Sequence, residues 1–261
     1  MRNLLALLVF LPYLCPSAFG QTAAFSLDFD MYGDYVEWEG PVIPSAGDFS
    51  CLAWSYCPYP VPTGGEGNSP DNGGYGNGFR NVISQGDEVA AIFIGYQPDG
   101  KMRVSHAWSN IEVQYPFGEW VHLGVVCNAT AGTTTLYMNG EEVASTLSIM
   151  LPTPGTWFRV GRQWNNEHED WFGNIDDVSL WDTPLDADEV VQYMNCAPEG
   201  SESGLIGLWN FDLGEGDLAI DQSPLGNNGL IYGAEYVSAT PEMECDESAE
   251  LTNEVDLGED N

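Results

Sequence analysis

The stretch from Phe172 to Glu189 reads FGNIDDVSLWDTPLDADE, which predicts a β-strand, a turn and the start of a helix. Side chains alternate between the two faces of a strand, so Asp176 and Asp177 are expected on opposite faces. The same alternation places Asp176 with Val178 and Leu180, on the face that points into a core. A carboxylate there is costly unless it is hydrogen-bonded or bound to a metal ion. This strand therefore predicts a buried sheet and a candidate site together.

The rest of the chain alternates short β-rich segments with clusters of turn residues. Residues 49–54, 89–96 and 102–108 read as strands, and Asn139-Gly140 is a strong hairpin signal. Helical periodicity is confined to 186–194, which opens with acidic residues that suit a helix N-terminus. Several short strands at regular spacing predict an all-β sandwich of two antiparallel sheets, with one short helix after the closing strand.

Three segments resemble a known family. The stretch above is similar to GxIDDVxLW…xLsxxE, residues 25–38 to ALDFDGxDDYV, and residues 119–143 to a W-x-H…LYVNG hairpin. In this order they resemble the LamG-like jelly rolls, which are concanavalin A-like sandwiches related to laminin G and pentraxin domains. The resemblance covers residues 25–196 and implies a jelly-roll sandwich.

The chain divides into four parts. Residues 1–20 read as a secretory signal peptide cleaved near Gly20, with a charged start and an apolar stretch too short to span a bilayer. Residues 21–196 form the predicted jelly-roll domain, and 246–261 form an acidic tail that we expect to be disordered. We therefore expect a secreted protein without membrane insertion.

The fourth part, residues 197–245, has two interpretations. Within it, 204–241 resembles the segment that normally opens this jelly roll, although it follows the closing strand. The segment either folds back and supplies edge strands to the same sandwich or begins a second repeat. The fold-back is the preferred interpretation, because a lone segment would expose Leu208, Trp209 and Phe211 to water.

The charge balance is strongly acidic. The chain has 6 Lys and Arg residues against 40 Asp and Glu residues, a formal net charge of −34. Nucleic acid is a poor partner for such a surface, because phosphate binding relies on basic side chains. The acidity indicates either a solvated surface suited to a salty medium or, at a few positions, ligands for a divalent cation.

Five cysteines remain after removal of the predicted signal peptide, so at least one is not in an intramolecular disulfide. Cys196 and Cys245 bracket the C-terminal segment and are the first expected pair. Cys51 and Cys57 close a short loop, or either pairs with Cys127. Spacing alone leaves this open.

The family resemblance implies a structural calcium ion, with carboxylates near the closing strand and further ligands from the DQSPLGNNG loop. Carried over to this chain, the candidate ligands are Asp176, Asp177, Asp221, Asn228 and Asp30. Calcium takes six to eight oxygen ligands from several segments, which folding would gather. The alternative is that Asp221 and Asn228 cap turns and Asp177 lies in solvent.

The predicted function is a secreted, non-catalytic recognition or adhesion module for carbohydrate or a glycan-bearing surface, as the resemblance implies. Aromatic residues in loops are the candidate ligand contacts, namely Tyr59, Tyr75, Trp164 and Trp171. One alternative is a structural component of an extracellular matrix or surface layer. The second is a polysaccharide-degrading enzyme. We expect no enzyme, because Glu167-His168-Glu169-Asp170 does not match the E-x-D-x-x-E pattern of sandwich hydrolases.

Overall fold

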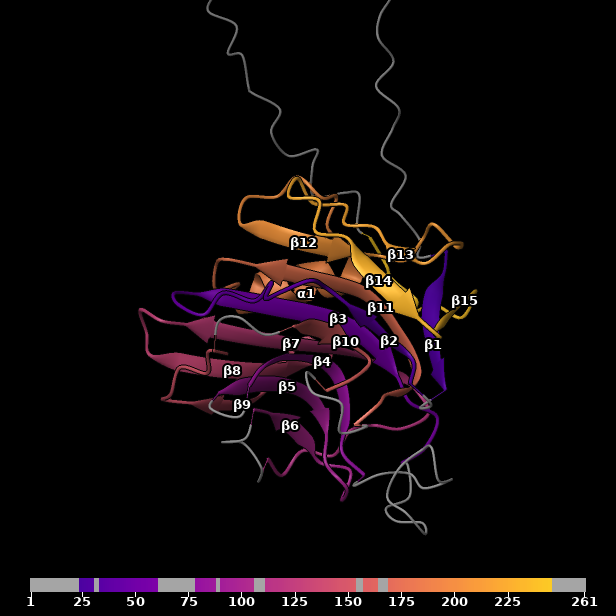
Figure 1. Cartoon of the computed structure of the whole chain (residues 1–261). Helices are drawn as coiled ribbons and strands as arrows, with labels where there is room; N and C mark the ends of the chain where they lie inside the picture. The colour runs from indigo at the N-terminus through magenta and orange to yellow at the C-terminus, as the bar shows by residue number, and fades with distance from the viewer. Residues whose placement is uncertain are drawn as a thin grey trace, which may run out of the picture.

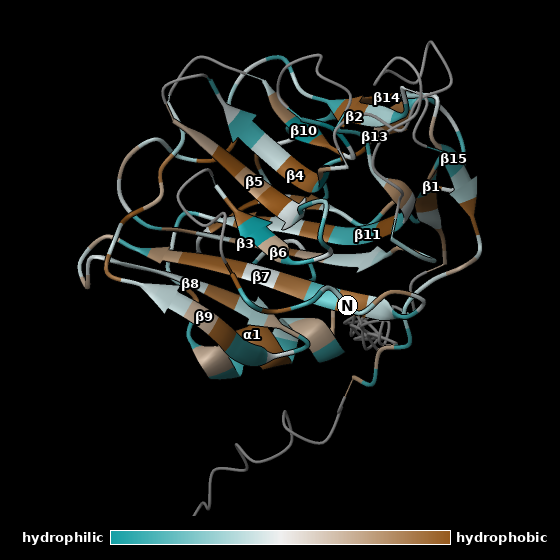
Figure 2. Cartoon of the chain, turned by 90° about the horizontal axis from the view of Figure 1, so that it is seen from below, coloured by the Kyte–Doolittle hydropathy of each residue, from teal (hydrophilic) through white to brown (hydrophobic). Residues whose placement is uncertain are grey.

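The computed structural model describes residues 24–30, 33–60, 78–87, 90–105, 111–153, 157–163 and 169–245. They form two antiparallel sheets packed face to face, with one helix on the outside (Figures 1 and 2). The all-β, two-sheet prediction is confirmed. The predicted signal peptide and acidic tail, together with Tyr75 and Trp164, lie outside the described residues.

Several neighbouring strands are far apart in sequence, as expected for a jelly roll, whereas others are joined as consecutive hairpins. The eight-stranded sheet has the order β15-β1-β11-β3-β7-β8-β9, with β12 also paired to β11. Its strands are β1 (Ser26–Asp30), β3 (Phe49–Tyr56), β7 (Trp120–Asn128), β8 (Thr133–Met138), β9 (Glu141–Thr146), β11 (Phe172–Trp181), β12 (Leu205–Trp209) and β15 (Glu235–Val237). The seven-stranded sheet has the order β13-β14-β2-β10-β4-β5-β6. Its strands are β2 (Tyr35–Glu37), β4 (Arg80–Gly86), β5 (Ala91–Tyr96), β6 (Met102–Val104), β10 (Phe158–Val160), β13 (Leu218–Ala219) and β14 (Gly229–Tyr232).

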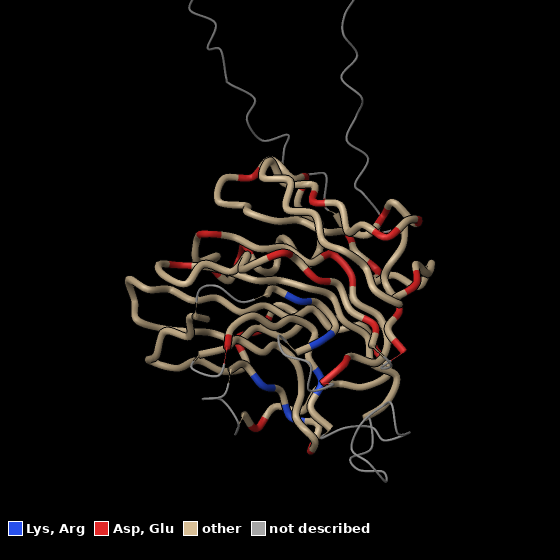
Figure 3. The backbone as a smooth tube through the Cα atoms, in the orientation of Figure 1, with Lys and Arg blue, Asp and Glu red and all other residues tan. Residues whose placement is uncertain are grey.

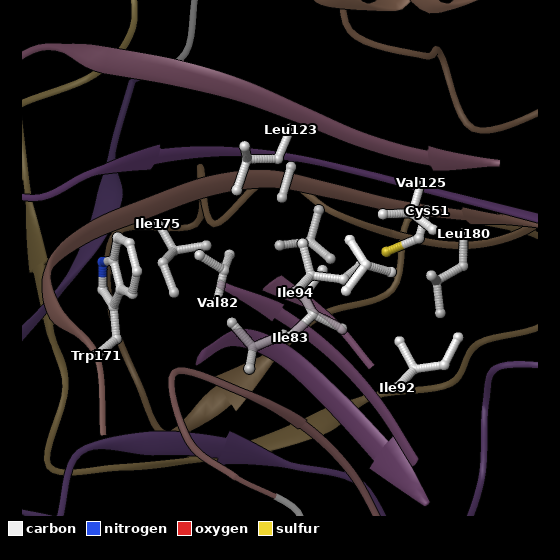
Figure 4. Packing of buried hydrophobic residues seen from close by; sticks show 14 of the residues in the cluster. Cys51, Val82, Ile83, Ile92, Ile94, Leu123, Val125, Trp171, Ile175 and Leu180 are labelled. Carbon is white, nitrogen blue, oxygen red and sulfur yellow. The ribbon is translucent and has the colours of Figure 1, made fainter. Parts of the chain in front are cut away.

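The main core lies between the two sheets. Ile83 and Ile94 of the seven-stranded sheet face Leu123 and Ile175 of the other sheet, and Trp171 closes one end (Figure 4). All five side chains are at most 2% exposed. Burial of such side chains on two inner faces is the main stabilising contribution in a sandwich of this kind.

A second apolar cluster lies on the outer face of the eight-stranded sheet, under helix α1 (Ala187–Asn195). Asp186 begins the helix with a capping box, in which its Oδ1 accepts the Glu189 N–H and Glu189 Oε2 accepts the Asp186 N–H. Val190 is fully buried against the sheet, and Tyr193 packs on Trp181 at 4.6 Å between ring centroids. The helix therefore covers apolar surface that the strands alone would expose.

The C-terminal segment contributes strands to both sheets of the same sandwich. Strand β12 pairs with β11, β15 pairs with β1, and β14 pairs with β2 (Figure 1). The carbonyl oxygen of Asn227 accepts the indole N–H of both Trp38 (2.8 Å) and Trp209 (2.9 Å). Leu208, Trp209 and Phe211 are each at most 4% exposed, so the fold removes the apolar side chains of this segment from water.

A disulfide bond joins Cys196 to Cys245 across a sequence separation of 49 residues. Cys51, Cys57 and Cys127 are free thiols and are buried. Burial raises the pKa of Cys57 to about 11, against weaker effects of its hydrogen bonds with the Tyr96 hydroxyl and to the Tyr59 carbonyl oxygen. A thiol with a raised pKa is a poor nucleophile, so these three cysteines serve as apolar packing. Within the described residues, no helix is both long and apolar enough to span a bilayer.

His122 of β7 is a buried, acid-sensitive position on the outer face of the eight-stranded sheet, since its neighbours Val121 and Leu123 face the core. Its ring is 2% exposed and lies 5.2 Å from the ring of Trp54, and Nδ1 has no hydrogen-bond partner among the described residues. Burial lowers the pKa of His122 to about 3, because the charged form would lose its hydration.

We expect His122 to destabilise the protein as the pH falls. The folded pKa is below the unfolded value of about 6.5, so the unfolded chain takes up the proton first and stability is lost between about pH 6.5 and pH 3. At pH 5 the loss is about 2 kcal/mol relative to neutral pH. Urea unfolding of wild type and His122→Leu at both values checks this, and parallel pH dependences in the two proteins would contradict it.

Candidate cation-binding site

Strand β11 has two different neighbours along one edge. Its first half pairs with β1, where Ile175 lies opposite Leu27, and its second half pairs with β12, where Val178 lies opposite Trp209. Asp176 and Asp177 are the two residues between these pairings. The start of β1, the end of β12 and the middle of β11 therefore meet at the two carboxylates.

A β-bulge places both side chains in the interior. Between Asp176 and Ser179 the pairing with β3 shifts by one residue, and Asp177 has a φ of +45°. The extra residue breaks the strict alternation of faces. Asp176 is 0% exposed, as its face predicted, and Asp177 is only 7% exposed. The interpretation of Asp177 as a solvated residue is therefore wrong, because the alternation rule does not hold across a bulge.

The two buried carboxylates lack donors. Asp176 Oδ1 accepts the N–H of Asp177 at 2.9 Å, whereas Oδ2 of both residues is buried without a hydrogen-bond partner among the described residues. Burial raises the pKa of Asp177 to about 7, and the charge of Asp212 adds to the effect. Burial, followed by the charge of Asp177, raises the pKa of Asp176 well above its ordinary value. Each carboxylate needs either a proton or a cation.

Asp212 is the third member of this group, which we call the acid cluster (Asp176, Asp177 and Asp212). Asp212 Oδ1 accepts the N–H groups of Ala24 (2.5 Å) and Phe25 (3.3 Å), which connects the end of β12 to the start of β1. Asn210 Nδ2 donates to Asp212 Oδ2 at 3.0 Å. Between them Phe211 has a φ of +53°, a strained value for a bulky residue.

Sequence reasoning missed Asp212. The signal was present in the stretch NFDLGEGD, which follows β12 in the segment that resembles the family's opening strands. Nothing in the sequence says which of its aspartates faces the closing strand. The pairing of β12 with β11 is what places Asp212 beside Asp176 and Asp177.

The acid cluster fits a hard cation by its chemistry. Two buried carboxylate oxygens without donors are ligands that calcium accepts, and a cation would offset their repulsion. Within the described residues, no group of three or more His, Cys, Asp or Glu side chains is already arranged to hold a metal ion. A cation here would thus draw remaining oxygens from backbone carbonyls, amide side chains or water, which are ordinary calcium ligands.

Asp221 and Asn228, predicted above as metal ligands, are used in this structure for hydrogen bonds that hold their loop. Asp221 Oδ1 accepts the N–H groups of Leu208 (2.9 Å) and Ser223 (2.8 Å). Its Oδ2 accepts the Ser223 hydroxyl (2.9 Å) and the Asn227 N–H (2.7 Å). Asn228 Oδ1 accepts the Asp221 N–H at 2.9 Å. Because four donors already use the Asp221 carboxylate, it fastens its loop to β12 and has little capacity left for a cation.

Asp30 lies away from the acid cluster. It is the last residue of β1 and pairs with Phe172, whereas Leu27 pairs with Ile175 beside the bulge. Three residues of strand separate the two positions by about 10 Å. The Asp30 backbone N–H donates to Asp34 Oδ2 at 2.8 Å. The strand register therefore corrects the inclusion of Asp30 in one site with Asp176.

The candidate ligand-binding aromatics divide into two groups. Tyr59 is 54% exposed, with its ring 5.2 Å from that of Phe172. Trp171 is 0% exposed and packs against Tyr96 and Tyr115, each at 5.7 Å between centroids. Trp171 is therefore a core residue and has no face open to a sugar ring, which corrects its assignment.

Of the carboxylates considered for hydrolysis, Glu169 and Asp170 form ion pairs, and Glu167 lies outside the described residues. Glu169 Oε2 accepts Arg103 Nη2 at 2.6 Å and Asn81 Nδ2 at 2.9 Å. Asp170 Oδ1 lies 2.8 Å from Arg162 Nε. Glu169 and Asp170 are at most 4% exposed. In this arrangement the two side chains join the segment before β11 to the outer face of the seven-stranded sheet.

Two known mammalian proteins are similar in sequence to most of this chain. Rat (Rattus norvegicus) sushi, von Willebrand factor type A, EGF and pentraxin domain-containing protein 1 is 24% identical over 223 residues, which cover 78% of this chain and 6% of that protein. The mouse (Mus musculus) protein of the same name is 24% identical over 205 residues. This chain thus spans about a twentieth of the length of these curated relatives.

Solved structures agree on the fold. A Bacteroides ovatus protein described as carbohydrate-binding matches with a TM-score of 0.62 at 15% identity, over 87% of this chain and 63% of that one. A heptameric SAP-like pentraxin from Limulus polyphemus matches with a TM-score of 0.53 at 14% identity, over 83% and 96%. The model of the concanavalin A-like lectin/glucanases superfamily matches residues 30–191, more than half of the 261 residues. This chain belongs to the concanavalin A-like lectin/glucanases superfamily.

Proposed function

We propose that this chain is a secreted, non-catalytic module that binds carbohydrate or a glycan-bearing surface, with a calcium ion that completes its fold at the acid cluster. Membership of a lectin and glucanase superfamily supports the glycan ligand. The disulfide Cys196–Cys245 supports an oxidising, extracellular location. Ligand recognition would then occur on a surface whose strands are fixed by the cation.

The observation that carries the calcium proposal is the pair of buried Oδ2 atoms on Asp176 and Asp177. Asp176, Asp177 and Asp212 come from the two segments whose junction closes the sandwich. A bound divalent cation supplies positive charge and oxygen coordination there. The side chains themselves hold the bulge of β11 and the end of β12 in place against the start of β1.

We expect calcium to raise the melting temperature of the wild-type chain. Binding to the folded state alone contributes about 2.7 kcal/mol at a hundredfold excess over Kd, and for a domain of this size each kcal/mol corresponds to roughly 2–4 °C. Asp177→Asn should lose this response, and in EDTA it should melt above the wild type because one buried charge is removed. Thermal melts in EDTA and in calcium measure both effects.

Glu215→Gln is the matched control for this experiment, because Glu215 is an exposed acid of the same C-terminal segment. It should keep the full calcium response. An equal response in Asp177→Asn and wild type would place the cation elsewhere. No response in either protein would remove calcium from the proposal and leave the acidity as a surface property.

Binding of glycans is tested separately, on an array of neutral and acidic oligosaccharides probed with the whole chain in calcium. Binding to defined sugars supports the proposal. Calcium-dependent self-assembly without sugar binding would instead favour a structural role in an extracellular matrix or surface layer. Release of reducing sugars or unsaturated products from polysaccharides would show an enzyme and contradict the non-catalytic assignment.

A further inference from the structure

One part of the outer face of the seven-stranded sheet combines exposed aromatic and aliphatic side chains with an ion pair that is mostly buried beside them. Across β10, β2, β14 and β13 the register places Arg159, Glu37, Leu230 and Leu218 in one row. Their neighbours Val160, Val36, Ile231 and Ala219 contact the core between the sheets. Because faces alternate along a strand, the row points away from the core. Leu230 and Leu218 in it are each 43% exposed, whereas the ion-paired side chains of Arg159 and Glu37 are 9% and 12% exposed.

Two tyrosines stack beside this row. Tyr35 of β2 and Tyr232 of β14 are paired in register, with ring centroids 4.6 Å apart and ring planes inclined by 16°. The guanidinium groups of Arg162 and Arg159 lie 4.8 and 5.3 Å from the Tyr35 ring. The order is therefore arginine, Tyr35, Tyr232. Tyr232 is the outer member and is 39% exposed.

Glu37 supplies a fixed acceptor next to the rings. Its Oε2 accepts Arg159 Nε at 2.6 Å and also contacts Nη2 of the same residue, while Arg159 Nη1 donates to the carbonyl oxygen of Gln163. Within the part of the chain that the structure describes, Glu37 Oε1 accepts no hydrogen bond, and it is not fully buried. The carboxylate is thus anchored through Oε2, and although its side chain is only 12% exposed, Oε1 keeps acceptor capacity for a hydrogen-bond donor.

The charge distribution separates this sheet from the rest of the surface. Five of the six basic residues of the chain are described, and all five lie on the seven-stranded sheet or next to it: Arg80, Lys101, Arg103, Arg159 and Arg162 (Figure 3). Arg103, Arg159 and Arg162 are each paired with a carboxylate, so their charges are compensated locally in a chain of net charge −34. A neutral ligand rich in hydroxyl groups suits such a surface, because it brings no charge to desolvate.

We propose that Tyr232, Tyr35 and Glu37 form a binding platform for a neutral oligosaccharide, an inference that rests on the proposed glycan-binding function. The apolar face of a sugar ring packs on the exposed ring of Tyr232, and a sugar hydroxyl donates to Glu37 Oε1. Leu230 and Leu218, each 43% exposed, extend the apolar surface along the row. A rigid aromatic pair next to a few fixed polar groups provides both contact area and orientation.

The test uses the full chain in calcium and, as probes, the neutral oligosaccharides that bind it best on the array. Isothermal titration should show about a tenfold weaker affinity for Tyr232→Ala, the loss expected for an aromatic contact. Tyr232→Phe should bind like the wild type, because the ring is kept. Leu147→Ala, at a 91% exposed position just after β9 of the other sheet, is the control for an exposed apolar residue and should also bind normally.

Each outcome has a distinct meaning. Unchanged affinity in Tyr232→Ala, with or without a loss in Tyr59→Ala, would overturn the platform while leaving the glycan-binding function intact. A wild-type chain that binds none of the array sugars would refute the proposed function and the platform with it. Tyr232→Ala should melt within a few degrees of the wild type, and Glu37→Gln, which keeps an acceptor oxygen, gives a second reading of the same surface.

Discussion

Asp221→Ala should lower the free energy of unfolding by about 3–5 kcal/mol, a large part of the stability of a typical domain. The carboxylate accepts four hydrogen bonds, from the N–H groups of Leu208, Ser223 and Asn227 and from the Ser223 hydroxyl. Removing it leaves these donors, which are buried or half-buried, without an acceptor. The carbonyl oxygen of Asn227 accepts the indole N–H groups of Trp38 and Trp209. Releasing Asn227 should therefore also weaken the hydrogen bonds of two core side chains.

Urea unfolding followed by tryptophan fluorescence measures this effect. Glu215→Ala removes the same charge from an exposed position of the same segment and should change stability by less than about 0.5 kcal/mol. Similar midpoints for the two variants would refute the role of Asp221 as the fastening residue of this loop. The response to calcium should survive in Asp221→Ala wherever the variant is folded, since Asp221 is not part of the acid cluster.

The double variant Cys196→Ser/Cys245→Ser should lose about 4 kcal/mol, the loop-closure contribution expected for a sequence separation of 49 residues. The closed loop contains β12, β13, β14 and β15, which pair with β11, β2 and β1. Without the cross-link the unfolded chain gains the freedom of this whole segment. The sandwich should therefore become more sensitive to heat and urea.

Wild type in reducing agent is the internal control for the disulfide. Its urea midpoint should approach that of the double variant, and added reducing agent should leave the double variant unchanged. A double variant as stable as oxidised wild type would mean that strand pairing alone fixes the C-terminal segment. Single Cys196→Ser and Cys245→Ser variants should each match the double variant, because either one breaks the bond.

The class of fold could be predicted from the sequence because the patterns that indicate it are local. Strand-length apolar alternation in 172–181, the Asn139-Gly140 turn and the acidic start of α1 each depend on a few neighbouring residues. The structure confirms the two-sheet sandwich that they predicted, and the family match agrees. The capping box of Asp186 and Glu189 is likewise a short-range pattern, and its hydrogen bonds are formed as that pattern requires.

Only part of the candidate cation-binding site could be predicted from the sequence. Burial of Asp176 follows from its position beside Val178, whereas burial of Asp177 depends on a bulge that the sequence does not announce. Asp221 and Asp212 are both aspartates of the same C-terminal segment, and composition does not distinguish a carboxylate saturated with donors from one that faces other carboxylates. Their partners lie on strands that are distant in sequence.

The sequence by itself therefore determined the class of fold, the acidic surface and one buried carboxylate of β11, because these follow from periodicity and charge along the chain. Tertiary structure alone decided that residues 204–237 complete the sandwich, that Asp212 joins Asp176 and Asp177, and that Trp171 is core while Tyr232 is surface. The physical reason is that hydrogen-bond saturation and burial are set by pairings between distant strands, which only the folded chain brings together.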